Sequence, residues 1–448
     1  MAVELIYVLD TVRYIQEVYK CAKALRQIMF LGRPLEGLQR KEEVVKGTKR
    51  LPQQRLVCYE ALGLIICGFW LLSLGVVWAE IKLGPVQVHP GIEVEEVYRT
   101  NIYQTEKNER DDWITVISPS LSLNLPMRGR HEAHLGYSGL AYIYDRYGGE
   151  DHYDQIWDGH LFLDFPGGLA TRLSGSITDA TLERRPGVNR QREYNEYNTE
   201  LSLEYAFAKR WQAKASYRYD EWDFEKDIDD RQSYTTNAGA VVMQYRILPR
   251  TWALLEGGYA ENSYDEAGIN DNDIYAVFLG LEWGPKGKLK GELKGGYAWK
   301  NYDRHRARRD NSPSDWSSQV GLTWDVDRRT SFKVTASRAF MDDIDYLNAS
   351  YLSNIFRLGF QRRIYPKITF NIYGAYQRDE YTDKLIEPST SIRKDREDES
   401  IRVGLGLRYD IQDYLFMGVK WYYEDEDSNF REYSYSENRL IIRLGVLY

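Results

Sequence analysis

Charged residues at alternate positions are the residues of this sequence best placed to do chemistry. They are Glu200, Glu204, Lys214, Arg218, Glu282, Lys290, Glu292, Lys294, Arg402, Arg408, Lys420, Glu424, Arg439 and Arg443. Charges of both signs occur. Such side chains on one face of a sheet would line a water-filled space and could contact hydrophilic solutes. We predict that they line a lumen. A lumen closed by interlocked salt bridges or by inward-folded loops is the alternative.

The histidines show no pattern of a catalytic or metal site. They are His89, His131, His134, His152, His160 and His305. The sequence contains no Gly-x-Ser-x-Gly, His-Glu-x-x-His or Walker motif. Acidic segments such as 106–112 are interpreted as solvated loops rather than as divalent-cation sites. We therefore predict no enzyme activity, no cofactor and no metal site, and the net charge of −8 argues against nucleic-acid binding.

The charged positions belong to segments in which apolar and polar residues alternate strictly. In 197–207, Tyr197, Leu201 and Leu203 share one face and Glu200 and Glu204 share the other. Segments 401–410 and 439–448 alternate in the same way. Period-two alternation predicts half-buried β-strands.

Turn signals divide the chain from residue 92 onward into strands. Short turns are predicted at 126–130, 165–168, 206–210, 247–250, 284–287, 325–329, 363–366 and 410–413. Longer polar connections are predicted at 101–112, 146–153, 182–192, 225–232, 264–271, 303–313, 342–347, 381–395 and 428–433. Seventeen connections join 18 strands, and short and long connections alternate, as in outer-membrane barrels.

Aromatic residues gather near both ends of the predicted strands, as expected where a barrel crosses two membrane interfaces. We predict an all-β fold, a transmembrane antiparallel up-and-down β-barrel of about 18 strands. It would have short periplasmic turns, longer external loops and both termini in the periplasm. The final aromatic residue, Tyr448, resembles the signal that the barrel assembly machinery reads. A soluble β-protein is the alternative fold.

The first 91 residues are predicted to lie outside the barrel. Residues 62–79 carry no charge and follow several basic residues, so 55–79 reads as a secretory signal peptide cleaved after Ala79, with a membrane-anchoring helix as the alternative. Residues 1–54 are an N-terminal extension, either real or the product of a start site placed too far upstream. Residues 80–91 form a periplasmic lead-in, and the barrel covers 92–448.

The segment 98–145 carries a family resemblance. Asn101-Ile102-Tyr103-Gln104-Thr105 is followed by Asp112-Trp113-Ile114 and by Pro119-Ser120-Leu121. This pattern, with Asn101, Asp112 and Pro119 as its marks, resembles the beta-barrel porin 2 family of outer membrane beta-barrel proteins. Ser120 departs from the glycine that is usual there. The resemblance implies an outer-membrane pore without catalytic residues, in a family whose members are often associated with polysaccharide export.

The function we expect is a bacterial outer-membrane conduit for a hydrophilic substrate, foremost a secreted exopolysaccharide. A general diffusion porin for small solutes and a non-conducting structural or adhesive barrel are the alternatives. The expected partners are outer-membrane lipid and lipopolysaccharide, the barrel assembly machinery and a periplasmic polysaccharide-export protein.

Overall fold

The computed structural model divides the chain into two compact units, Met1–Trp78 and Ala79–Tyr448. It describes residues 81–186, 188, 190–225, 232–265, 271–284, 287–302, 313–343, 350–387 and 390–447. The predicted N-terminal extension, the signal peptide with its cleavage site, and the C-terminal Tyr448 lie outside the described residues.

Eighteen long strands, each of 12 to 16 residues, build the second unit across its described ranges. They are β2 (Val86–Arg99), β3 (Asp112–Pro126), β4 (Glu132–Tyr144), β5 (His152–Asp164), β6 (Leu169–Leu182), β7 (Arg192–Tyr205), β8 (Trp211–Phe224), β9 (Tyr234–Leu248), β10 (Thr251–Tyr264), β11 (Asn272–Trp283), β12 (Leu289–Tyr302), β13 (Ser314–Asp325), β14 (Thr330–Asp342), β15 (Ser350–Tyr365), β16 (Ile368–Tyr381), β19 (Glu397–Asp410), β20 (Leu415–Ser428) and β21 (Tyr435–Leu447).

Smaller elements lie in the segments next to the ends of these strands. They are β1 (Ile81–Leu83), the hairpin of β17 (Leu385–Ile386) and β18 (Arg393–Lys394), and the 3-10 helices η1 (Gly148–Glu150) and η3 (Arg431–Tyr433). Within the described ranges, no helix is long and apolar enough to cross a membrane.

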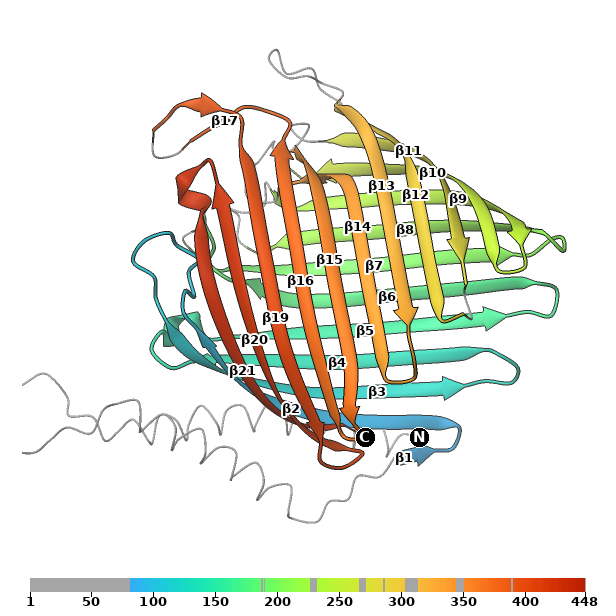
Figure 1. Cartoon of the computed structure of the whole chain (residues 1–448), viewed down its shortest axis with the longest axis horizontal. Helices are drawn as coiled ribbons and strands as arrows, with labels where there is room; N and C mark the ends of the chain where they lie inside the picture. The colour runs from blue at the N-terminus through green and yellow to red at the C-terminus, as the bar shows by residue number, and fades with distance from the viewer. Residues whose placement is uncertain are drawn as a thin grey trace, which may run out of the picture. The chain divides into compact units, whose positions relative to one another are not determined.

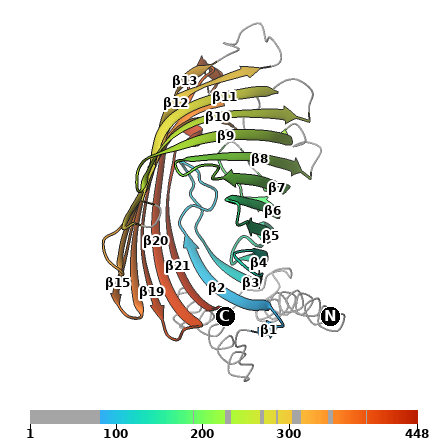
Figure 2. The same cartoon turned by 90° about the vertical axis from the view of Figure 1, so that its right-hand side faces the viewer.

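The sheet closes on itself as an antiparallel barrel (Figures 1 and 2). Each long strand pairs with the next along the chain, and β21 pairs with β2 from Gly91↔Leu447 to Arg99↔Arg439. Closure leaves no long strand with an unpaired edge, which a sheet surrounded by hydrocarbon requires. The predicted fold class and the strand number are confirmed, and all eight short turns and nine longer connections fall where the turn residues place them.

The predicted barrel start at residue 92 was too late, because β2 begins at Val86. β21 reaches β2 only at Gly91, and β1 pairs only with Val86–Val88, so His89 and Pro90 have no strand partner on that flank. Pro90 pairs in register with Leu121 of β3, on the other flank. A proline is tolerated where one neighbouring strand is missing.

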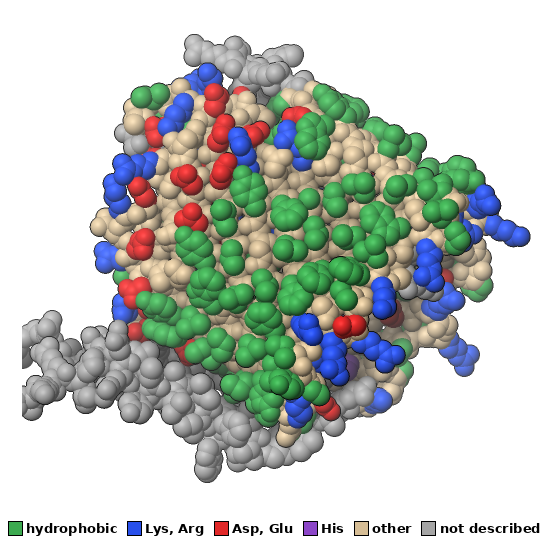
Figure 3. Space-filling model, in the orientation of Figure 1, with side chains coloured by type: hydrophobic (Ala, Val, Ile, Leu, Met, Phe, Trp, Pro, Cys, Tyr) green, Lys and Arg blue, Asp and Glu red, His purple; other side chains and the backbone are tan. Residues whose placement is uncertain are grey.

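The convex face of the barrel is apolar. The alternating residues Leu201, Leu203 and Tyr205 of β7 are 38%, 41% and 48% exposed, and the other long strands carry similar exposed leucines, valines and aromatics. Figure 3 shows hydrophobic side chains in a broad band across the visible face, with acidic side chains mainly toward one end of it and basic ones toward the other. An apolar surface of this extent is far larger than soluble monomers expose.

Candidate functional site

Ion pairs that skip a strand identify the charged face as the concave one. Lys294 on β12 contacts Glu256 on β10, with an Nζ–Oε2 distance of 2.9 Å across β11. Lys214 on β8 lies 3.5 Å from Glu282 on β11, although β9 and β10 run between them. Side chains diverge on a convex surface and converge on a concave one, so contacts of this reach place these residues in the lumen. Gln244 of β9 joins them by donating to Glu282 at 2.7 Å.

The wall of β19, β20 and β21 brings together a second set of the predicted lumen residues. Arg402 Nε donates to Glu424 at 2.8 Å, and Arg439 lies 3.5 Å from the same carboxylate. Arg443 reaches across to Glu93 of β2 at 3.3 Å. The contact between Arg443 and Glu93 crosses the seam where the barrel closes, so the charged lumen wall continues over it.

The remaining predicted residues share the lumen face and are only partly paired with one another. Glu200 stands opposite Arg218 in register, and Glu204 stands opposite Lys214. Arg218 instead pairs with Asp220 on its own strand at 2.7 Å. Three more lumen candidates pair as follows: Lys290 with Asp325 at 3.0 Å, Glu292 with Lys294 at 3.0 Å, and Arg408 with Asp410 at 2.7 Å.

A buried arginine ties three parts of the chain together at the loop end of the barrel. Arg99, at the end of β2, is 4% exposed. Its Nε and Nη2 donate to Glu437 of β21 at 2.5 and 3.1 Å, and its Nη1 donates to Glu183 in the β6–β7 loop. The hydroxyl of Tyr144 also donates to Glu183, at 3.0 Å. Burial opposes ionisation of Glu183, but Arg99 outweighs it and lowers the pKa of this carboxyl.

An apolar cluster covers the lumen face of β2, β3 and β4 near the same end. Val97, Ile114 and Val116 lie on the same face as the charged residues and are buried. Ile102 of the β2–β3 loop packs on them, with Tyr103 beside it. This part of the loop therefore folds onto the inner wall, where apolar residues replace charged ones.

The β16–β19 and β20–β21 connections form a second compact group. Arg396 is stacked between Tyr381 and Tyr433, 4.6 and 3.6 Å from the ring centroids, and pairs with Asp398 at 2.7 Å. Phe430, which is fully buried, packs nearby against Tyr433. Flat guanidinium groups bind well between aromatic faces. The described parts of these two connections are thus held together by packing and ion pairs.

The family-marking residues hold the backbone of this loop end. Asn101 is fully buried, and its amide donates to the carbonyl oxygens of Thr105 and Ser436 at 2.8 and 3.1 Å. The Asp112 carboxylate accepts from the backbone N–H groups of Arg146 at 3.0 Å and of the residue that follows it at 3.2 Å. Pro119 lies where the β3–β4 pairing is interrupted, so its missing N–H breaks no ladder bond there. Their roles are structural.

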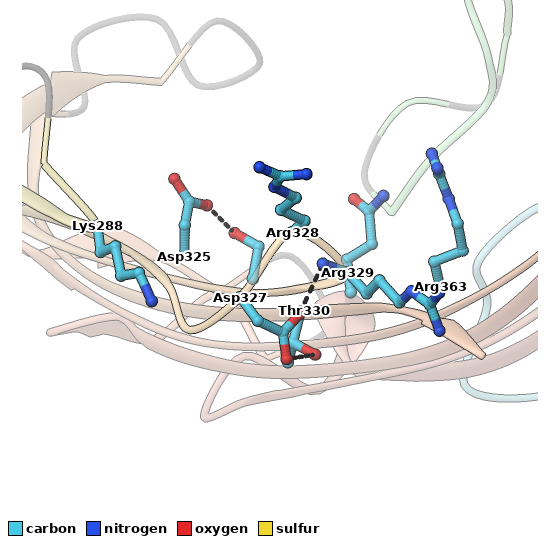
Figure 4. A pocket seen from close by; sticks show the side chains of 9 residues that line it. Lys288, Asp325, Asp327, Arg328, Arg329, Thr330 and Arg363 are labelled. Carbon is cyan, nitrogen blue, oxygen red and sulfur yellow. Dashed lines mark hydrogen bonds between the residues drawn. The ribbon is translucent and has the colours of Figure 1, made fainter. Parts of the chain in front are cut away.

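The turn end of the barrel carries a basic pocket of about 560 Å³ (Figure 4). The hydrogen bond from the backbone N–H of Arg329 lowers the pKa of Asp327, which also accepts from the Thr330 hydroxyl at 3.3 Å. Asp327 thus orders the β13–β14 turn. The pocket is lined by Lys288, Asp325, Asp327, Arg328, Arg329, Thr330, Ser331, Gln361 and Arg363.

Sequence reasoning missed the residues that tie the loop end. Arg99, Glu183 and Arg396 are single charges beside polar loops. Nothing in the spacing of Arg99 reveals partners 84 and 338 positions away, or in that of Arg396 its two stacking tyrosines. Among the described residues, no three His, Cys, Asp or Glu side chains are grouped so as to hold a metal ion.

Comparison with solved structures returns barrels at low similarity. The FrpB iron transporter from Neisseria meningitidis is 12% identical, with a TM-score of 0.43 over 76% of this chain, which spans only 62% of that protein. OccK1 (OpdK) of Pseudomonas aeruginosa is 9% identical, with a TM-score of 0.46 over 81% of this chain and 99% of its own. OccK2 (OpdF) of the same organism is 12% identical, with a TM-score of 0.45 over 81% and 98%.

At these values we draw no argument about substrate from the solved structures. No curated protein matches the chain. A family model, in contrast, matches nearly the whole barrel unit, over residues 79–447. The chain belongs to the family described as "Putative beta-barrel porin 2".

Proposed function

We propose that this barrel is an integral protein of a bacterial outer membrane that lets small hydrophilic solutes diffuse through its charged lumen. The observation that carries the proposal is the division of each strand into an apolar convex face and a concave face with strand-skipping ion pairs. An apolar exterior suits acyl chains, and a charged interior needs water. The short turns and both chain ends would lie in the periplasm, and the longer loops outside.

Between the two conduit hypotheses, the family favours the porin. Its description names a porin and no polymer, so the exopolysaccharide conduit is the weaker hypothesis. The loop end adds a physical reason, because Ile102 and Glu183 occupy space along the inner wall there. Inward-packed loops narrow a passage for a polymer more than for a solute the size of one sugar.

The proposed surroundings follow from the same division of faces. Outer-membrane lipid and lipopolysaccharide would contact the apolar band, and the barrel assembly machinery would insert the chain. A periplasmic polysaccharide-export protein would be a partner only for the exopolysaccharide conduit.

Planar bilayers test the proposal directly. The chain from residue 80, refolded in detergent, is expected to insert and give steady single-channel currents in KCl, and liposomes containing it should swell in small neutral sugars. A correctly folded barrel that conducts no ions would overturn the porin and support the structural or adhesive alternative. A deletion strain that loses surface polysaccharide, together with absent swelling, would instead support polymer export.

A further inference from the structure

A depression in the lumen wall lies where β16, β19, β20 and β21 run side by side. Its volume is about 170 Å³. This is below the roughly 300–1,000 Å³ of drug-sized ligand sites, so it suits one small ring rather than a chain of them. The depression is lined by Asn371, Tyr373, Gly404, Leu405, Gly406, Leu407, Arg408, Lys420, Tyr422 and Arg443.

Two glycines of β19 create the depression. Gly404 stands between Tyr373 of β16 and Tyr422 of β20 in the strand register. The Tyr422 ring leans over Gly404, where an added Cβ would come within 2.6 Å of it. At Gly406 an added Cβ would meet only ordinary contacts, the nearest at 3.5 Å from Lys420, so a side chain there would occupy the trough without displacing a neighbour. The result is a trough with tyrosine rings at one end.

The other end of the trough is cationic and has unused hydrogen-bonding capacity. Lys420 stands opposite Gly406, and its ammonium group forms no ion pair or hydrogen bond with any described residue. Arg443 pairs with Glu93 through Nη1 only, and its enclosed Nε has no partner in the described part of the chain. Arg408 is already committed to Asp410 at 2.7 Å.

Two carboxylates next to the trough compensate its cations only in part. Glu93 pairs with Arg443 at 3.3 Å, and Glu93 and Glu95 both attract Lys420, but neither carboxylate lines the depression. The charged groups that do line it are all positive. An anionic ligand in the depression would therefore face only cations and would give the enclosed Arg443 Nε a partner.

We infer that this trough is a binding subsite for a single-ring monocarboxylate, with the carboxylate on Lys420 and Arg443 and the ring against Tyr373 and Tyr422. This inference rests on the proposed function and deepens it, since it names the solute class that the lumen retains in transit. Two sources share this chemistry, sugar acids and aromatic acids. Both present a flat or ring-shaped face of apolar CH groups beside one carboxylate, which aromatic rings and paired cations complement.

The test uses the whole barrel from residue 80 in detergent, with binding measured by saturation-transfer NMR and titration calorimetry. The probes are galacturonate, benzoate and neutral galactose. K420M removes the free cation at nearly constant length, and G406V fills the trough. The matched control is R172M, which removes a lumen charge on β6, five strands away from β21 around the barrel.

We expect one or both acids to bind, galactose to bind much more weakly, and K420M and G406V each to raise the dissociation constant by at least about 10-fold. R172M should leave it within about twofold of wild type. Binding by galacturonate alone, or by benzoate alone, identifies the source. Equal binding of galactose and galacturonate, or equal effects of K420M and R172M, would overturn the subsite.

Failure of the subsite and failure of the porin are separable. If the barrel conducts ions in bilayers but neither acid binds in detergent, only the subsite is wrong. If the acids bind with the expected loss in K420M but no current is seen, the subsite holds and the conduction proposal fails.

Discussion

Replacing Arg99 by methionine is expected to destabilise the barrel through its closing seam. The substitution keeps most of the side-chain volume but removes the charge that neutralises two carboxylates. Glu437 is 1% exposed, so it would be left buried without its main partner. Arg439 still donates to it at 2.6 Å, which limits the loss.

The expected magnitude follows from burial. Breaking one side of a buried ion pair costs about 3–5 kcal/mol. We expect the lower end, about 3 kcal/mol, because Arg439 remains and the Glu183 side chain is 33% exposed. That corresponds to roughly a hundredfold change in the equilibrium constant of unfolding. The control is R146M in the β4–β5 loop, where Arg146 pairs with Asp111 in solvent and should contribute at most about 1 kcal/mol.

Urea unfolding of the barrel in lipid vesicles, followed by tryptophan fluorescence, measures both variants. Adding E437Q to R99M should recover part of the lost stability, because the buried carboxylate is then neutral. The reasoning is refuted if R99M lowers the free energy of unfolding no more than R146M does. It is also refuted if adding E437Q to R99M lowers the free energy of unfolding further instead of restoring part of it.

Three further outcomes follow from the loop end and the barrel wall. Since the pKa of Glu183 is lowered in the folded barrel, its contribution to stability is complete above the ordinary carboxyl pKa and is lost as pH falls through the lowered one. Single-channel conductance should therefore shift as the pH falls below the ordinary carboxyl pKa, and E183Q should abolish that shift. N101A should cost about 1–3 kcal/mol in the same urea assay, because the Ser436 carbonyl loses its donor; a loss below about 0.5 kcal/mol would contradict this role. G296A should fail to fold, since its Cβ would lie 1.9 Å from a backbone oxygen of β11, whereas G295A, where the space is open, should fold normally. Gel mobility of heated and unheated samples measures the folded fraction of each variant. Equal folding of the two variants would contradict the close approach at Gly296.

The strand plan could be predicted from sequence because one periodicity governs it. Successive strand residues alternate between the lipid face and the lumen face, as Leu201 and Glu200 illustrate. Tight turns accept only a few residue types, which marks the strand ends. The periodicity did not locate the start of the first barrel strand, because alternation gives no information on how far β1 and β21 pair along β2.

The interior could be predicted only in part. Parity identified Lys294 and Glu424 as lumen residues, but period two gives no information on pairing across skipped strands. It also cannot show that Ile114 and Val116 face inward, because both faces of β3 are apolar there. Predicting the glycine trough beside Lys420 would require the residue-by-residue register of all the strands that form it. Turn positions alone do not specify that register.

The division of each strand into a lipid face and a water face is tested most directly by labelling adjacent residues of β7. Cysteine is absent from residues 80–448, so L201C and E200C each give a single site for a nitroxide spin label. In lipid vesicles, the label at position 201 should collide mainly with oxygen dissolved in the acyl chains, and the label at 200 with a water-soluble nickel complex. Equal accessibility at the two positions, or the reverse order, would contradict the account.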